Sequence, residues 1–316
     1  MSWTFVHVAD SHMGTPRSYR FRPAVNRRWA AIKEQIAGTG AEFLLHGGDL
    51  TRDGELHEFE YIQARDDLNT LPFPTFAIPG NMDVGNKHAQ DRGTKRPWDD
   101  RTLNVKAARL DLFASYFGPI HWTFLYRGVR FTGFYAAVAG TGYRQERQLW
   151  HLVDALPELP AARHHVAVMH YWPFMEVPDE PAWDITRESE YDNWYFSIDP
   201  PHRNRLLAAL KAAHVDILFC GHVHTGRSVQ EVEGMRIYRV PAAGNTSQLG
   251  ERWEDAETRV GFHLCEVTDS GINVRFIPGA DQCEEFGTFG PWGHPGPEER
   301  DYSIAREKPA IGPDGL

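Results

Sequence analysis

Short apolar segments alternate with segments of helical period along this 316-residue chain, and this alternation constrains the fold most strongly. Residues 4–10, 42–49 and 74–81 are short and rich in Val, Ile, Phe and Leu, whereas 24–40 and 55–71 repeat apolar residues at helical spacing. The order predicts a β-α-β-α-β unit with parallel strands joined by right-handed crossovers.

The same rhythm returns in the second half of the chain. Helical segments 144–156 and 202–214 precede strand-like segments 164–170 and 215–222. Three further segments read as hairpins that turn at Gly or at Asp-Ser-Gly, namely 120–135, 227–240 and 261–277. Together these patterns predict an α/β fold with a mixed sheet, or with two sheets packed face to face.

No linker divides the chain, so we expect one domain over residues 1–278. The tail 279–316 holds Gly or Pro at 12 of its 38 positions, which disfavours a compact element there. Two insertions interrupt the rhythm after predicted strands. Residues 84–106 carry six Lys or Arg against three Asp, and residues 171–199 carry eight Asp or Glu against one Arg.

Composition narrows the partners and the compartment. A net charge of −10 gives the whole molecule no attraction for a polyphosphate backbone, so a nucleic-acid polymer is not the expected partner. No apolar run approaches the roughly 20 residues of a membrane span, and because the first strand begins near residue 3 we expect no secretory signal. Three widely spaced cysteines suit a reducing compartment, and we expect a cytoplasmic protein.

Oxygen and nitrogen ligands follow each predicted strand. In an open α/β sheet the carboxyl ends of the strands converge on one crevice, so segments spread over 215 residues can meet there. Asp-x-His and His-x-His place alternate side chains on one side of extended backbone, the spacing needed to grip one cation or two adjacent ones. These candidate metal ligands are Asp10, His12, Asp49, Asn81, His170, His222 and His224.

The series D-x-H, G-D, G-N-x-D, H and G-H-x-H, in that order between residues 10 and 224, resembles the calcineurin-like metallophosphoesterases. The resemblance implies a four-layer α/β/β/α fold, in which two mixed sheets form a sandwich flanked by helices. It also implies two divalent metal ions at the strand ends. In that family pattern Asp10, His12 and His224 hold one metal, Asn81, His170 and His222 hold the other, and Asp49 bridges them.

The chemistry of the ligands agrees with that implication. Imidazole and carboxylate suit Mn, Fe, Zn or Co better than Mg or Ca. Two divalent ions set against Asp10, Asp49 and a bridging hydroxide leave a charge of +1, which attracts a phosphoester. Such a pair acidifies a shared water for attack on phosphorus, so we expect a metal-dependent phosphoric ester hydrolase whose catalytic residues are Asp10, Asp49 and Asn81.

Met82 departs from the family pattern. The family often has His after G-N, where it is credited with stabilising the transition state or protonating the leaving group. General acid help is typically worth about 10²–10⁴-fold, and Met supplies none. Met82 is read either as a filler of packing space, or as a gap that Arg52, His57, Lys87 or His88 compensates with positive charge.

The insertions also carry substrate-binding candidates. We expect Arg52, Lys87, His88 and Trp172 to face the substrate. Lys87, Arg92, Lys95, Arg96 and Arg101 of the basic insertion would bind a phosphate from the rim opposite the Trp-rich insertion. The alternatives are that the basic run is a solvated face, and that Trp172, Trp183 and Trp194 bury the acidic insertion or form a homodimer interface. Trp292 and His294 of the tail are further candidates to cover the site.

Four functions remain open at this point. By resemblance the leading one is a phosphodiesterase that hydrolyses small diesters such as cyclic nucleotides. A DNA-repair-type nuclease is an alternative, since residues 7–14, "HVADSHMG", resemble the first motif of double-strand-break repair nucleases, and a phosphomonoesterase is another. The fourth is a metal-bearing pseudoenzyme or binding module, an interpretation motivated by Met82.

Overall fold

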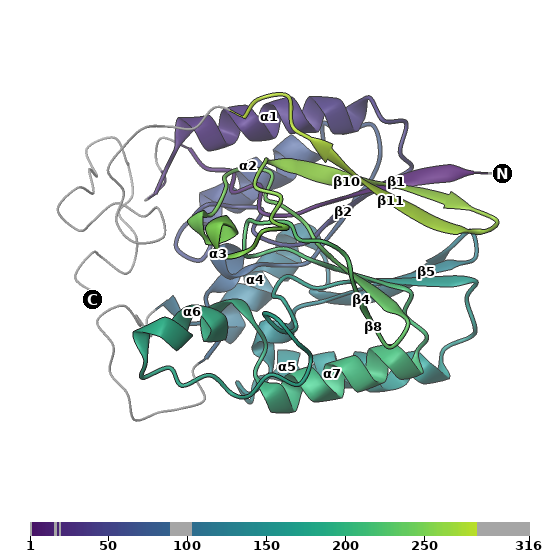
Figure 1. Cartoon of the computed structure of the whole chain (residues 1–316). Coiled ribbons are helices and arrows are strands. Elements are labelled where there is room, and N and C mark those ends of the chain that lie inside the picture. Colours follow the sequence, from purple (N-terminus) through teal and green to yellow (C-terminus); the bar gives the residue numbers. More distant parts are fainter. Residues whose placement is uncertain (1, 16–17, 19, 89–102, 283–316) are drawn as a thin grey trace.

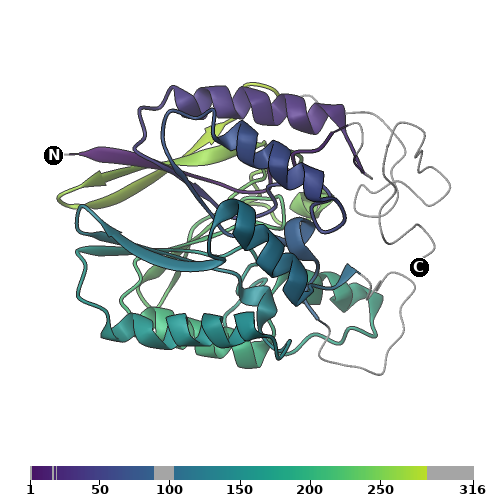
Figure 2. The same cartoon turned by 180° about the vertical axis from the view of Figure 1, so that it is seen from behind.

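Two β-sheets pack face to face between two layers of helices, as the family resemblance predicted (Figure 1). This computed structural model describes residues 2–15, 18, 20–88 and 103–282. Figure 2 shows the same four layers from behind. The prediction of a sandwich of two mixed sheets flanked by helices is therefore confirmed.

The first sheet has the strand order β11-β10-β1-β2-β3. Strands β1, β2 and β3 run parallel, and β10 and β11 add to β1 as an antiparallel hairpin. This is the predicted β-α-β-α-β unit with a predicted hairpin at its edge. Its strands are β1 (Trp3–Val8), β2 (Leu44–His46), β3 (Thr75–Ala77), β10 (Gly261–Thr268) and β11 (Gly271–Pro278).

The second sheet has the order β4-β5-β6-β7-β9-β8. Its four central strands are parallel, while β4 and β8 pair antiparallel at the edges through the two other predicted hairpins. Its strands are β4 (His121–Tyr126), β5 (Val129–Phe134), β6 (His164–Val168), β7 (Ile217–Cys220), β8 (Gln230–Val232) and β9 (Met235–Arg239).

Helices cover both outer faces of the sandwich. In Figure 1 helix α1 lies over the first sheet, and α5 and α7 lie under the second. The sequence patterns predicted α1 (Pro23–Ala37), α2 (Glu58–Leu68), α5 (Arg144–Ala155) and α7 (Pro200–Ala212), but not α4 (Ala107–Phe117) or α6 (Glu188–Phe196). Within the described part of the chain, every helix is too short or too polar to cross a membrane. The remaining turns are α3 (Asn81–Val84), η2 (Ala136–Val138), η3 (Leu156–Glu158) and η4 (Gln248–Arg252).

Aromatic rings fill the space between the sheets. Phe5 stacks on Phe43 at 5.6 Å between ring centres, and Phe43 meets the edge of Phe131 at 5.0 Å. All three are buried, and each such side chain contributes about 1.5–3 kcal/mol of burial free energy. This layer fixes the two sheets against each other, so the carboxyl ends of their parallel strands share one end of the sandwich.

The tail begins directly after β11. Its first residues pack on the domain, where Nε2 of Gln282 donates to the Val260 carbonyl at 2.9 Å and the amide of Ala280 donates to Gln35 at 2.8 Å. The boundary at residue 278 stays a prediction. Several residues named above lie outside the described part of the chain: Arg92, Lys95, Arg96, Arg101, Trp292 and His294.

Candidate metal centre

Most of the predicted ligands sit in a left-handed backbone conformation. The φ angles are +58° at Asp10, +47° at His12, +54° at Asp49, +73° at His222 and +59° at His224. Positive φ is uncommon outside Gly, although Asp and His tolerate it better than most residues, and such conformations cluster at functional sites. The chain thus turns sharply after β1, β2 and β7, at the ligands themselves.

Two glycines leave room for the carboxylates. A Cβ atom on Gly80 would lie 2.0 Å from Oδ1 of Asp49, and one on Gly221 would lie 2.6 Å from Oδ2 of Asp10. Neither position accepts a side chain without moving a candidate ligand. The Gly-Asn and Gly-His motifs therefore bring backbone against the two carboxylates.

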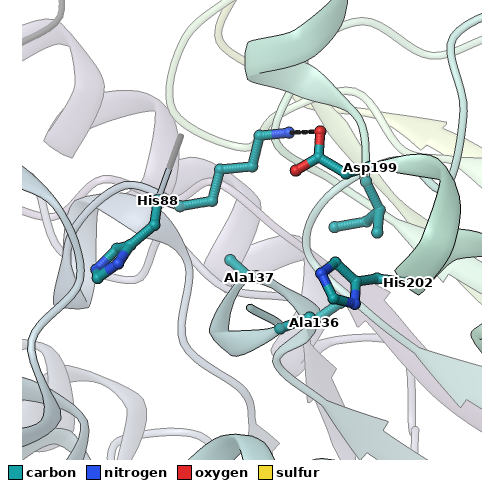
Figure 3. Close-up of a pocket in the computed structure, with 8 residues that line it drawn as sticks. His88, Ala136, Ala137, Asp199 and His202 are labelled. Carbon is teal, nitrogen blue, oxygen red and sulfur yellow. Dashed lines mark hydrogen bonds and ion pairs between the residues drawn. The ribbon is translucent and has the colours of Figure 1, made fainter. Parts of the chain in front are cut away.

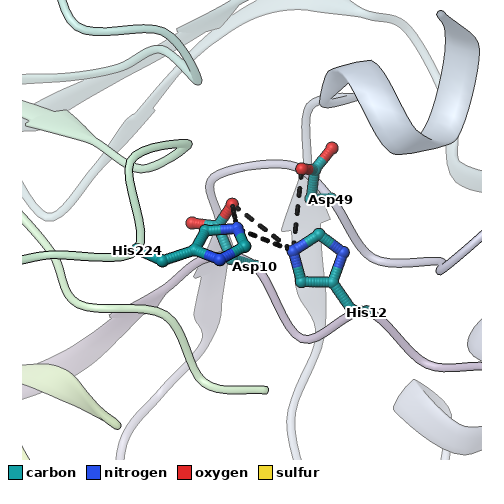
Figure 4. A group of neighbouring side chains, drawn as sticks. All are labelled: Asp10, His12, Asp49 and His224. Carbon is teal, nitrogen blue, oxygen red and sulfur yellow. Dashed lines mark hydrogen bonds and ion pairs between the residues drawn. The ribbon is translucent and has the colours of Figure 1, made fainter. Parts of the chain in front are cut away.

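Four ligands form the first half of the centre (Figure 4). Nε2 of His224 lies 3.3 Å from Oδ1 of Asp10, and Nε2 of His12 lies 3.8 Å from Oδ2 of Asp49. The two imidazole Nε2 atoms are only 2.9 Å apart. One donor atom from each residue lies within 4.8 Å of every other, so Asp10, His12, Asp49 and His224 can share one cation.

Asp49 also belongs to a second group. Its Oδ2 lies 3.4 Å from Nε2 of His170, and His222 places a ring nitrogen within 4.8 Å of both. Oδ1 of Asn81 lies 3.2 Å from the same Nε2 of His170. All seven predicted ligands therefore come together, in two groups that share Asp49.

Outer hydrogen bonds decide which ring nitrogen faces each group. His170 places Nδ1 2.9 Å from the carbonyl of Gly47, which leaves Nε2 for the centre. His222 places Nε2 3.2 Å from the carbonyl of Tyr195, which leaves Nδ1. Such partners orient metal-binding histidines and fix their tautomers. The donor set of two carboxylates, one amide oxygen and four imidazoles fits a pair of transition-metal cations.

Burial keeps two of these rings neutral. Burial, together with the charge of neighbouring histidines and arginines, holds the pKa of His12 well below its usual range. Burial is also the main cause of the low pKa of His222. Burial also lowers the pKa of His170, but the charge and hydrogen bond of Asp49, the charge of Asp10 and the hydrogen bond to Gly47 together outweigh burial and raise that pKa to about 9. A cation here competes with the proton of His170, because a ligating imidazole must be deprotonated.

The carboxylates lack ordinary counter-charges. Among the described residues, the ion pairs of Asp10 and Asp49 are all with histidines. Two buried carboxylates without lysine or arginine are costly unless cations compensate them. This arrangement is what a site for divalent ions requires.

Asp83 braces the loops beneath the centre. Its carboxylate accepts from the amides of Gly80 at 2.8 Å, Thr51 at 2.9 Å and Leu50 at 3.2 Å. It thereby ties the turn after β2 to the turn after β3. Burial and the charge of Asp49 raise the pKa of Asp83 to about 7.

Met82 contributes its main chain to the centre. Its amide donates to Oδ1 of Asp49 at 2.8 Å, while its side chain is buried. The buried thioether is consistent with the packing interpretation.

The predicted basic contacts are engaged with the protein itself. Nε of Arg52 donates to the carbonyl of Arg20 at 3.2 Å, and Arg52 is buried. Nζ of Lys87 donates to the Ser197 carbonyl at 2.6 Å and lies 4.5 Å from the centre of the Trp194 ring. Burial lowers the pKa of Lys87 to about 8. Their proposed roles toward a substrate stay predictions.

A small pocket lies beside Lys87 (Figure 3). Its volume of about 10 Å³ is roughly the space of one water molecule. His88 also lines it, with Nε2 2.9 Å from the Val105 carbonyl. The other residues around it include Ala136, Ala137, Asp199 and His202, and the pocket does not admit a substrate.

Trp172 lies in the core instead of facing a substrate. Its ring is fully buried, with the guanidinium of Arg239 4.3 Å from the ring centre and Trp253 at 5.5 Å. Trp194 is buried too, beside Tyr191 at 5.5 Å. These aromatics pack the acidic insertion onto the domain, and the predicted stacking of Trp172 on a substrate has no structural support.

Sequence patterns missed three polar partners of the ligands. Tyr195 and Asn86 both bond to Asn81, and the amide of Asn245 lies 3.1 Å from Nδ1 of His224. Tyr195 and Asn86 belong to the insertions, where no periodicity or motif marks a contact with a strand end. Only Asp83 carried a signal, as the acidic residue that ends the G-N-x-D motif.

Comparisons with known proteins agree with this geometry. The family model described as calcineurin-like phosphoesterase matches residues 4–226, a range that contains all seven candidate ligands. No curated protein matches the chain.

Several solved structures share the fold. GAP50, described as the anchor in the inner membrane complex of Plasmodium, is 15% identical, with a TM-score of 0.53 over 89% of this chain and 86% of that one. The purple acid phosphatase PPD1 of yellow lupin (Lupinus luteus) is 13% identical, with a TM-score of 0.59 over 90% of this chain, which spans about half of the enzyme, 52%. A dimetal phosphatase of Danio rerio is 12% identical, with a TM-score of 0.51 over 88% of this chain and 96% of that one. At these identities the similarity concerns the fold.

Proposed function

This chain belongs to the calcineurin-like phosphoesterase family, and from that premise we propose that it is a dinuclear metal-dependent hydrolase of small phosphodiesters. The observation that carries the proposal is the pair of ligand groups that share Asp49. Cyclic nucleotides are the first diesters to test.

The ligand set defines what the chain contributes to hydrolysis. Asp10, His12 and His224 would hold one cation, Asn81, His170 and His222 the other, and Asp49 both. When bound, two divalent cations supply Lewis acidity that lowers the pKa of water and stabilises charge on a phosphoryl group. Asp10 and Asp49 bring only two negative charges to this centre, so it favours an anionic ester.

The residue after Asn81 bears on the leaving group. Met82 cannot donate a proton, so the chain favours esters whose leaving oxygen departs without one. This supports aryl diesters, and esters strained by a ring, as the first substrates. An alkyl ester with a basic leaving group is expected to react more slowly.

Charge favours a small substrate over a polymer. The insertion 171–199 has a net charge of −7 from eight acidic residues and one Arg, and it begins directly after the ligand His170. Phosphate contacts normally dominate the affinity of a protein for DNA, and an acidic rim opposes them. We therefore rank a nuclease below a diesterase of small molecules.

A hydrolysis panel under added Mn²⁺ tests the proposal. It comprises aryl monoesters, aryl diesters, 2′,3′- and 3′,5′-cyclic nucleotides, phospholipid headgroup diesters and single-stranded DNA. We expect turnover of small diesters that chelation abolishes. Monoesters are included because two structural neighbours are named as phosphatases.

The other outcomes reject the proposal in distinct ways. Turnover of monoesters alone would make the protein a phosphomonoesterase. Degradation of single-stranded DNA, with binding that falls steeply as salt rises, would make it a nuclease. Metal binding without hydrolysis of any ester would make it a binding module.

A further inference from the structure

The acidic insertion returns to the centre at its far end. After α6 the chain pairs with its own beginning, because the amide of Trp172 donates to the Phe196 carbonyl at 3.2 Å and that of Ile198 donates to the Trp172 carbonyl at 3.1 Å. Lys87 holds the same stretch through the Ser197 carbonyl. Tyr195, at the end of α6, is thereby fixed beside the second group of ligands.

Three side chains then form a closed triangle of hydrogen bonds. Nδ2 of Asn81 donates to Oη of Tyr195 at 3.0 Å and to Oδ1 of Asn86 at 3.1 Å. The hydroxyl of Tyr195 donates to the same Oδ1 of Asn86 at 3.1 Å. Each polar atom in the triangle has a complementary partner.

The triangle fixes which way the Asn81 amide points. An amide nitrogen has two hydrogens, and both are used here. Oδ1 is left facing Nε2 of His170 at 3.2 Å, on the side where a cation would lie. Turned by 180°, the amide would set its oxygen against Oδ1 of Asn86 and its N–H groups toward the cation, and both contacts are repulsive.

The same residue orients a second ligand. The main-chain carbonyl of Tyr195 lies 3.2 Å from Nε2 of His222, and their rings lie 5.2 Å apart. This contact leaves Nδ1 of His222 for the centre. Tyr195 therefore contacts two of the three ligands that belong to the second half alone, while the first half is built without it.

We propose that Tyr195 is a positioning residue for the second cation, and that the acidic insertion selectively completes the Asn81, His170 and His222 half of the centre. The proposal rests on the dinuclear site of the proposed function. It assigns to the insertion a role in metal occupancy, separate from any contact with substrate.

Metal binding to the Tyr195→Phe variant tests this. Binding of Mn²⁺ is measured by calorimetry and by equilibrium dialysis with elemental analysis, on protein first stripped of metal. We expect the Kd of one site to rise about tenfold or more, in line with other outer-shell changes, while the Kd of the other is unchanged. Limiting Mn²⁺ then gives one ion per chain and the electron paramagnetic resonance spectrum of an isolated ion.

Two further variants frame the result. Tyr191→Phe is the matched control, because it removes a hydroxyl from the same helix. Both amide hydrogen bonds of Asn81 go to residues other than Tyr191, so we expect wild-type Kd values for Mn²⁺ at both sites. Asn86→Ala removes the other corner of the triangle and should weaken the same single site. It supplies the test if Tyr195→Phe fails to fold, as judged by thermal unfolding.

Distinct outcomes reject the inference and the proposed function. Unchanged Kd values in folded Tyr195→Phe, or equal weakening of both sites, would overturn the role of Tyr195. A wild type that binds fewer than two ions would overturn both statements. Two ions with the expected loss in Tyr195→Phe, but no ester hydrolysis, would support Tyr195 and reject the hydrolase.

Discussion

The two halves of the candidate centre are built by different means. Asp10, His12 and His224 all have positive φ angles, so the backbone after β1 and β7 aims them directly. Asn81 lies in the short helix α3, and its amide is oriented by Tyr195 and Asn86 from outside the strand ends. In the second half only His222 shares that backbone conformation, and the orientation of Asn81 depends on residues of the two insertions.

Loss of the shared ligand should produce the largest effect. Asp49→Asn removes the charge that both groups share, so we expect both cations to bind weakly and turnover to fall by more than about 100-fold, since even outer-shell changes cost 10–100-fold. Elemental analysis and hydrolysis assays check this. A variant that keeps two ions at wild-type affinity would show that Asp49 does not bridge the halves.

Variants of single halves should separate next. His12→Ala and His170→Ala each remove a ligand from one half, so each protein should retain about one cation per chain. His170→Ala keeps the cation of the first half, which Tyr195 does not contact, so adding Tyr195→Phe should change its affinity little. His12→Ala keeps the cation of the second half, so adding Tyr195→Phe should release that cation. The difference arises because the effects of two substitutions are coupled only within one network of contacts. Equal behaviour of the two double variants would erase the distinction between the halves.

Acid should lower the free energy of unfolding through His46, which lies beneath the first half of the centre. His46 is buried, with Nε2 3.0 Å from the hydroxyl of Ser11, between Asp10 and His12. Burial lowers the pKa of His46 from 6.5 to about 3, so the unfolded chain takes up a proton between these values and stability falls as pH falls. From pH 6.5 to pH 5 this costs about 1.6 kcal/mol of unfolding free energy, because at pH 6.5 the unfolded histidine is already half protonated.

The measurement is denaturant unfolding of metal-free protein. His46→Gln keeps an N–H donor for the Ser11 hydroxyl, which donates its own hydrogen to the Leu50 carbonyl, and glutamine does not titrate. The stability gap between wild type and variant should therefore narrow by that amount as the pH falls. The comparison isolates His46 from carboxyls such as Glu55, whose pKa burial raises to about 8, with the opposite effect of pH. A stability gap that does not change with pH would show that protonation of His46 does not contribute to the loss of stability in acid.

Met82→His should have the smallest effect. The side chain is buried and the residue acts through its amide on Asp49, so turnover of an aryl diester should stay within about threefold. Rates for aryl and alkyl diesters check this. A large gain in turnover with alkyl diesters alone would show that the lack of a proton donor at Met82 limits the wild-type protein.

Much of the fold was predictable because its signals are local. Short apolar segments and helical patterns located every strand of the described residues and four of the helices, and Gly and Asp-Ser-Gly marked the hairpins. The ligands were predictable for the same reason, since each follows a strand whose direction fixes where it ends. The close approach of backbone at Gly80 and Gly221 explains why glycine precedes Asn81 and His222.

The insertions resisted prediction because their contacts are not local. Tyr195 is 114 residues from Asn81 along the chain, and no motif or periodicity around either residue predicts their hydrogen bond. Trp172 looked available for a substrate because sequence cannot say which side of an insertion is buried. Lys87 read as a free cation, yet it binds Ser197 and Asp199 at the end of that insertion.

Anomalous diffraction from crystals grown with Mn²⁺ would reveal directly whether the chain holds two cations on a shared Asp49. We expect two peaks per chain, one among Asp10, His12 and His224, the other among Asn81, His170 and His222, with Asp49 between them. Crystals of Tyr195→Phe at limiting Mn²⁺ should keep the first peak and lose the second. A single peak in the wild type, or peaks away from Asp49, would show that the chain does not hold two cations on a shared Asp49.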